Sequence, residues 1–154
     1  MIVSMKIFCT NRKAKFDYTV LETFEAGIVL KGSEVKSIVA HHCSLDGAYA
    51  QIIQNEIFLL GCNIDQFKQS GPFNNHEPKR QRKLLLHKQQ ILKLSEMVKA
   101  KGNTLIPLSI YQSEESVGVN KIKIKLGVCK GKQTHDKRQA LKEKDLKKRI
   151  SNHE

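Results

Sequence analysis

The chain has 154 residues, of which 40% are hydrophobic, enough for one packed domain rather than two independent cores. Lysine and arginine total 27 against 15 acidic residues, and the net charge of +12 predicts a polyanionic partner, nucleic acid ahead of an anionic membrane. No apolar run approaches the roughly 20 residues of a membrane span, no signal peptide is evident, and the four cysteines form no C-x-x-C pair. We therefore expect a soluble cytoplasmic protein with free thiols and no membrane partner.

The first third of the chain predicts a long strand followed by a short helix. Residues 16–30 read FDYTVLETFEAGIVL, in which apolar and polar residues alternate in part, and Gly27 is expected to bend the strand. Ser33 is expected to cap a helix over residues 34–40, where apolar residues recur at helical spacing.

The middle of the chain predicts two strands, a loop and a longer helix. The strands cover residues 49–53 and 57–60, and the polar stretch 67–78, rich in glycine, proline and asparagine, indicates a surface loop. An apolar stripe that begins at Leu84 predicts a helix that stops at Gly102.

Two further strands, over residues 104–111 and 119–128, complete the pattern. In the second, apolar residues alternate with lysines from Lys121 to Leu126, so one face is apolar and the other cationic. Five to six short strands with two to three inserted helices predict a mainly β fold, an antiparallel sheet closed into a small barrel. After Lys132 the apolar pattern stops.

The chain therefore divides into a folded body and a basic tail. Residues 1–132 are expected to form the barrel, and residues 133–154 a tail that is disordered when free, because it carries too little apolar surface to fold alone. Apolar residues in the tail lie a turn or two apart, so a helix is expected once a partner neutralises its charge.

Residues that could carry catalysis or bind a metal are few. His41, His42 and Cys43 are adjacent, but neighbours rarely converge on one ion, and no second pair lies at finger or ribbon spacing. No serine or cysteine has the context of a catalytic triad, and no Gly-Lys-Ser/Thr sequence follows Gly32. We expect no metal, no cofactor and no enzymatic activity.

The basic clusters are more informative. One lies at residues 11–15, and the other gathers Lys79, Arg80, Arg82 and Lys83 at a predicted junction between loop and helix. Guanidinium groups and helix-start amides both suit phosphate. The aromatic content of 6% argues against a stacking platform for single strands, which favours a folded RNA bound through shape and backbone.

Four motifs occur in order along the chain, at residues 11–14 (NRKA), 25–37 (EAGIVLKGSEVKS), 75–86 (NHEPKRQRKLLL) and 131–138 (GKQTHDKR). Together they resemble the SsrA-binding proteins (small protein B, SmpB). Residues 11–14 (NRKA) resemble the family's opening motif, and residues 25–37 (EAGIVLKGSEVKS) its E-A-G-[IL]-x-L-x-G-x-E-V-K-S signature. Residues 75–86 (NHEPKRQRKLLL) resemble N-H-[DE]-P-x-R-x-R-K-L-L-L, the most specific of the four, and residues 131–138 (GKQTHDKR) the element that opens the tail. The resemblance extends from residue 11 to about residue 148.

The resemblance implies an oligonucleotide-binding (OB)-type barrel that binds the tRNA-like domain of transfer-messenger RNA (tmRNA, SsrA RNA). With that RNA the protein would enter ribosomes stalled on messages without a stop codon, in trans-translation, without catalysing a reaction. The tail would become helical in the decoding centre and the empty messenger path of the small subunit. The implied partners are tmRNA, the stalled ribosome and the elongation factor that carries aminoacylated tmRNA; DNA is not among them, and we expect a monomer.

The matched motifs also imply which residues make the contacts. Those expected to bind tmRNA are Asn11, Arg12, Lys13, Glu25, Lys36, Asn75, His76, Arg80, Arg82, Lys83, Leu85 and His87. Those expected to contact the ribosome are Gly131, Lys132, His135, Asp136, Lys137, Arg138, Lys142 and Leu146. Packing in the core is an equally open role for Leu85, and backbone geometry is the favoured role for Gly27 and Gly32.

Three positions depart from the family pattern. Val39 stands where an arginine is usual, Gly47 begins a stretch that usually reads Asp-Ser-Tyr, and Leu146 stands where an aromatic residue is common. Two other functions were weighed. A generic RNA-binding OB-fold translation factor would explain charge and fold but not the motifs at residues 75–86 and 131–138, and an RNA-modifying enzyme would need a nucleophile, metal or cofactor loop.

Overall fold

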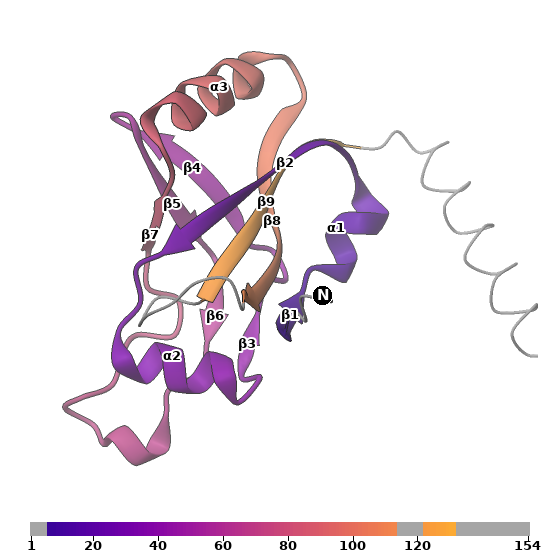
Figure 1. Cartoon of the computed structure of the whole chain (residues 1–154). Coiled ribbons are helices and arrows are strands. Elements are labelled where there is room, and N and C mark those ends of the chain that lie inside the picture. Colours follow the sequence, from indigo (N-terminus) through magenta and orange to yellow (C-terminus); the bar gives the residue numbers. More distant parts are fainter. Residues whose placement is uncertain (1–5, 114–121, 132–154) are drawn as a thin grey trace, which may run out of the picture.

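The computed structural model describes residues 6–113 and 122–131, which form a mainly β protein with three α-helices (Figure 1). In chain order the elements are β1 (Lys6–Thr10), α1 (Arg12–Asp17), β2 (Tyr18–Ile28), α2 (Gly32–Val39), β3 (Cys43–Ser44), β4 (Tyr49–Ile53), β5 (Glu56–Leu60), β6 (Asn63–Ile64), the 3-10 helix η1 (Lys68–Ser70), β7 (Arg82–Leu85), α3 (Lys88–Lys99), β8 (Asn103–Gln112) and β9 (Ile122–Gly131). None of the helices in these ranges is long and apolar enough to cross a membrane.

Seven of the strands form one antiparallel sheet in the order β1-β8-β4-β5-β7-β2-β9, and β3 pairs with β6 in a separate two-stranded sheet. Strand β8 also pairs with β9 along its whole length. On its other side β8 pairs with β4 at Leu105 and with β1 from Ser109 to Gln112. Strand β8 therefore has three paired neighbours, and β2, β4, β5, β7 and β9 have two each.

The core lies on the apolar face of this sheet. Ile124 and Leu126 of β9 are fully buried, while Lys125 between them is exposed, so the alternation predicted for this strand is confirmed where the structure describes it. Helix α3 adds Leu94, also fully buried. Each fully buried leucine or isoleucine contributes about 1.5–3 kcal/mol relative to an exposed one, so burial on this face stabilises the body.

The long strand predicted over residues 16–30 is shorter, because a helix precedes it. The side chain of Asn11 accepts a hydrogen bond from the Ala14 amide at 3.1 Å and caps α1. Its amide nitrogen donates to the carbonyls of Pro107 at 3.0 Å and Leu45 at 3.3 Å. These contacts with residues distant in sequence hold Asn11 in place as the cap, and residues 16 and 17 belong to helix α1 rather than to the strand.

The helix predicted from Leu84 also begins later, because Leu84 and Leu85 belong to β7. Leu84 is 2% exposed and Leu85 48% exposed, which is the alternation of a strand. The helix α3 starts at Lys88 instead. In the earlier helix, Lys31 is the N-terminal cap and Ser33 lies within α2, so the helix begins two residues earlier than predicted.

Other predictions agree more closely with the structure. The strand predicted over residues 49–53 is β4, and the strands predicted at 57–60 and 104–111 lie within β5 and β8. The five to six strands predicted are too few, since the described ranges hold nine, four of them (β1, β3, β6 and β7) not foreseen. The tail predicted over residues 133–154 lies outside the described residues.

Candidate nucleic-acid interface

Strand register brings one row of residues together on the outer face of the sheet. Gly27 of β2 pairs with Leu85 of β7 on one side and with Lys123 of β9 on the other, and Lys123 pairs in turn with Tyr111 of β8. Directly paired residues of antiparallel strands project from the same face. Leu85, Lys123 and Tyr111 therefore lie on one surface, around a glycine that has no side chain.

Gly27, Leu85 and Lys123 of this row line an open depression of about 500 Å³. Its wall contains Glu25 and Gly27 from β2, Leu85 from β7, and His87 at the start of α3. Leu86, Gln90, Ala26 and Lys123 complete the lining. The depression thus combines an acid, a cation, an imidazole and an exposed leucine.

The space in the depression depends on Gly27. A Cβ atom added there would lie 3.3 Å from the Cβ of Leu85, closer than almost all real contacts of this kind. Any larger residue would push Leu85 away or fill the depression. The role of Gly27 is therefore to leave room, and β2 continues past it to Ile28.

Glu25 is oriented by a buried tyrosine. The hydroxyl of Tyr111, a residue 5% exposed, donates a hydrogen bond to Oε2 of Glu25, which is itself exposed. Burial raises the pKa of the Tyr111 phenol above its ordinary value, and the hydrogen bond to Glu25 raises it further. The phenol therefore remains protonated as a donor, and the carboxylate is held as an acceptor at the rim of the depression.

A buried cluster of ion pairs links β7 to helix α2. Glu34 of α2 and Arg82 of β7 are both 0% exposed, and Arg82 Nε lies 2.5 Å from Glu34 Oε2. Arg80 Nη2 lies 2.6 Å from Glu34 Oε1, which also accepts from the Lys31 amide at 2.7 Å. Burial, the largest influence, raises the pKa of Glu34, but the hydrogen bonds from Arg80, Lys31 and Arg82 together lower it below its ordinary value.

The remaining donors of Arg82 point to backbone oxygens. Nη1 donates to the Cys62 carbonyl at 2.8 Å, and Nη2 donates to the Pro78 carbonyl at 3.0 Å. The guanidinium therefore joins α2, β7, and the segments on either side of the 67–78 loop. Its role in the folded protein is structural.

The comparisons with known proteins agree on one family. The family described as SmpB protein matches residues 8–153. The chain belongs to the SmpB family. SsrA-binding proteins of Protochlamydia amoebophila and Rickettsia bellii (strain RML369-C) are 46% and 47% identical over 92% and 96% of the chain, covering 88% and 94% of those proteins. The SsrA-binding protein of Symbiobacterium thermophilum is 49% identical over 92% of the chain and 86% of its own length.

A solved structure of an SmpB family member also matches. It is described as "tmRNA-SmpB: a journey to the center of the bacterial ribosome" and superposes with a TM-score of 0.67 at 40% identity. The match covers 86% of this chain and 93% of that chain. The resemblance inferred from the four motifs is thereby confirmed.

The structure brings together three of the residues expected to bind RNA and buries three others. Glu25, Leu85 and His87 meet at the depression, and Leu85 is a surface residue rather than part of the core. Arg82, His76 and Asn11 are 0%, 2% and 3% exposed, and each is hydrogen-bonded within the protein. Burial leaves these three side chains almost no exposed surface in this structure, and their hydrogen bonds support the fold. The RNA contact expected of them stays a prediction.

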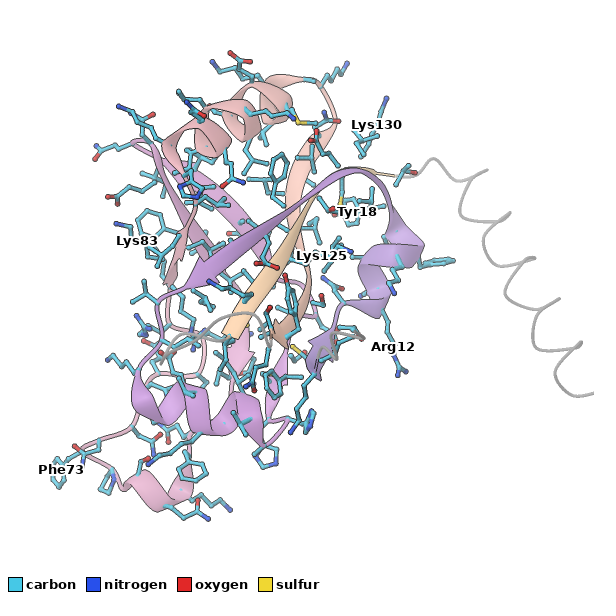
Figure 2. All side chains as sticks on the ribbon, viewed as in Figure 1. Arg12, Tyr18, Phe73, Lys83, Lys125 and Lys130 are labelled. Atoms are coloured by element: carbon cyan, nitrogen blue, oxygen red, sulfur yellow. The ribbon has the colours of Figure 1, made fainter. Side chains whose placement is uncertain are left out.

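The other expected residues lie on the surface in separate places. Arg12 and Lys13 are exposed on α1, and Lys36 is exposed on α2. Lys83 is exposed on β7 with Nζ 3.2 Å from Glu56 Oε1; Figure 2 shows Arg12 and Lys83 on different parts of the ribbon. The cluster that contains Lys83 lies at a junction between loop and strand, not at the predicted helix start.

The remaining expected RNA contacts are Asn75 and Arg80, and one expected ribosome contact, Gly131, also lies in the described ranges. Asn75 is half-buried and holds the 67–78 loop, and Arg80 keeps 27% of its side chain exposed beside Glu34. Gly131 is the exposed last residue of β9. The other expected ribosome contacts lie outside the described residues: Lys132, His135, Asp136, Lys137, Arg138, Lys142 and Leu146.

Sequence reasoning missed two residues that shape the site, Tyr111 and Glu34. Tyr111 ends an apolar strand and gave no sign of a polar partner, since Glu25 lies 86 positions away. Glu34 lies within the motif at residues 25–37, but its partners Arg80 and Arg82 lie 46 and 48 positions later in the sequence. Within residues 6–113 and 122–131, no group of three or more His, Cys, Asp or Glu side chains could hold a metal ion.

Proposed function

We propose that this chain binds tmRNA and acts with it on stalled ribosomes in trans-translation. The observation that carries the proposal is the convergence of Glu25, Leu85 and His87, which are distant in sequence, on one depression in a member of the SmpB family. The relatives named SsrA-binding protein support tmRNA as the bound RNA, and the similar structure, described as tmRNA-SmpB in the bacterial ribosome, supports action on the ribosome.

The depression suits a folded RNA chemically. An oriented carboxylate accepts hydrogen bonds only, so Glu25 selects donors, which RNA supplies as base N–H groups and ribose 2′-hydroxyls. The Lys123 ammonium in the same wall suits a phosphate, and the exposed Leu85 provides an apolar surface for a ribose or base. Binding through such contacts requires no turnover, and we propose that the protein is not an enzyme.

The architecture proposed is an OB-type closed barrel. The pairing of β8 with β9 supports closure, because it joins strands that otherwise stand near opposite ends of the strand order. Closure would fix the depression between strands that cannot splay apart. The body would end near residue 132.

We also propose that residues 133–154 form a separate basic tail that becomes helical in the decoding centre and the empty messenger path. In that proposal Lys137, Arg138 and Lys142 meet ribosomal RNA and Leu146 packs in an apolar cleft. The elongation factor that carries aminoacylated tmRNA, a monomeric state and a cytoplasmic location belong to the same proposal.

A salt titration of binding tests the RNA assignment. The full chain is titrated with tmRNA and with an ordinary tRNA at several salt concentrations. We expect tighter binding of tmRNA throughout, because phosphate contacts weaken with salt equally for both RNAs whereas shape-dependent contacts do not. Equal affinities at every salt concentration would favour a generic RNA-binding OB-fold translation factor.

Deleting residues 133–154 tests the division of labour. We expect the truncated chain to bind tmRNA with nearly unchanged affinity and to lose peptide tagging on stalled ribosomes. Loss of affinity for tmRNA on this truncation would show that body and tail do not act separately.

A further inference from the structure

The loop between β6 and β7 is held closed by the side chain of Asn75. Its Oδ1 accepts from the Phe67 amide at 3.0 Å, and its Nδ2 donates to the Phe67 carbonyl at 2.8 Å and to the Gly71 carbonyl at 3.1 Å. Asn75 therefore pairs with Phe67 as a neighbouring strand would. Gly71 turns the chain with a φ of 74°, a value that favours glycine.

The same loop is anchored to the body by His76. The two ring nitrogens of this buried histidine lie 2.8 Å from Ser33 Oγ and 2.8 Å from the Ile64 carbonyl. Its carbonyl accepts from Gln66 Nε2 at 3.0 Å. The motif at residues 75 and 76 thus attaches the loop to α2 and β6.

At the tip of this anchored loop stands Phe73, which is 97% exposed. Figure 2 shows its ring pointing away from the body at the end of the molecule beyond α2, far from α3. Its chain neighbours Pro72 and Asn74 are also exposed. The other exposed apolar side chains of the described ranges lie on different elements, so Phe73 is not part of a contiguous apolar patch around the loop.

Charges of both signs surround the loop. Lys68 lies within the loop, and Lys36 holds its ammonium 5.6 Å from the centre of the Phe67 ring. Asp65 before the loop, Glu77 within it and Lys79 after it are all exposed. The loop is therefore not a strong phosphate site, and the distinctive group it presents is the face of one aromatic ring.

A single ring of this kind suits an unpaired nucleobase better than a protein surface. Stable protein interfaces bury roughly 800 Å² on each partner, with several apolar residues at their centre, whereas one exposed ring is enough to stack one base. The pinned loop lowers the conformational entropy lost on stacking. The net charge of +12 attracts a polyanion, rather than a basic protein, to the chain as a whole.

We propose that Phe73 stacks on an unpaired base of tmRNA, as a second point of contact at the end of the molecule opposite α3. The inference rests on the proposed function. The loop and the depression are fixed to one body, because Arg82 bonds the segment before the loop, at Cys62, and β7 continues from Arg82 to Leu85. One folded RNA could therefore touch both.

Substitution of Phe73 tests the stack. Phe73→Leu keeps apolar bulk without a π face, and we expect binding of the tRNA-like domain of tmRNA to weaken by roughly 5- to 100-fold. Phe73→Tyr retains the stack and should bind within about twofold of the unchanged chain. Ile53→Ala, an exposed apolar truncation at the β4–β5 turn, is the matched control and should also stay within about twofold.

The chain contains no tryptophan, so Phe73→Trp introduces a unique fluorophore. Stacking on a base should quench its emission on addition of the RNA. The proposed stacking of Phe73 is wrong if Phe73→Leu binds tmRNA like the unchanged chain, or if the Trp emission does not respond to bound RNA. Either result refutes the stacking even if the chain still prefers tmRNA over tRNA. If the unchanged chain shows no such preference, the proposed function fails instead. A Phe73→Leu defect seen only on ribosomes would also overturn the inference.

Discussion

Replacing Arg82 by methionine distinguishes a role in folding from a role in RNA binding. Arg82 is fully buried, its Nε lies 2.5 Å from Glu34, and its other nitrogens donate to the Cys62 and Pro78 carbonyls. Methionine fills part of the volume but leaves the buried carboxylate of Glu34 with one arginine fewer. It also removes one donor from each of the two carbonyls, although that of Pro78 still accepts from the Ile64 amide at 2.9 Å. Removing one partner from a buried ion pair costs about 3–5 kcal/mol.

The neighbouring residue provides a matched control. Lys83 follows Arg82 in the same strand but is exposed, and its one ion pair, with Glu56, is solvent-exposed on both sides. Such pairs contribute about 0–1 kcal/mol. Lys83→Met should therefore change the free energy of unfolding by less than about 1 kcal/mol, several times less than Arg82→Met.

Urea denaturation of the full chain, followed by circular dichroism, measures both free energies. RNA affinity is then measured for Arg82→Met under conditions in which the variant is folded, and we expect it to remain close to that of the unchanged chain. Equal stability of the two variants would refute the reasoning, as would an Arg82→Met protein of full stability that has lost its RNA affinity.

Three further predictions concern ionisable groups. The folded pKa of Glu34 lies below the ordinary value of 4.5, so its stabilising contribution is complete above about pH 4.5 and is lost as the pH falls through the folded pKa. Urea titrations at a series of pH values measure this loss, and Glu34→Gln should remove it. Tyr111→Phe should weaken tmRNA binding by about fivefold, the worth of one hydrogen bond, by freeing Glu25, and an unchanged affinity would deny Tyr111 its orienting role. The thiol of Cys43 should be the fastest of the four to react with a thiol reagent, since the hydrogen bond from Cys9 lowers its pKa, and the fast phase should vanish in Cys43→Ser.

Local patterns were sufficient where one face of an element decides its structure. The alternation in β9 predicted which residues face the core, because a strand buried on one side must alternate. The end of α3 was predicted within a few residues from Gly102, whose φ of 87° favours glycine. The family motifs implied that Glu25 and Leu85 both belong to the RNA contact, but their spacing in sequence gave no sign that they would lie beside one depression.

Contacts between distant residues account for what the sequence did not reveal. A run of three leucines fits a helix or a strand equally well, and only the core decides that Leu84 is inside and Leu85 outside. Helix α1 depends on Asn11 reaching the carbonyl of Pro107, 96 positions away. The burial of Arg82 depends on Glu34, 48 positions earlier, so an arginine in a basic run could not be told from a surface cation.

The short first strand has a consequence for handling the protein. Strand β4 pairs with β8 only at Leu105, and β1 supplies the partner from Ser109 to Gln112. Without Lys6–Thr10, that stretch of β8 would present free backbone donors and acceptors to another molecule, which is how sheets aggregate. A fusion or truncation that displaces these five residues should therefore give a protein that self-associates through β8, although it keeps the residues that line the depression at Glu25, Leu85 and His87.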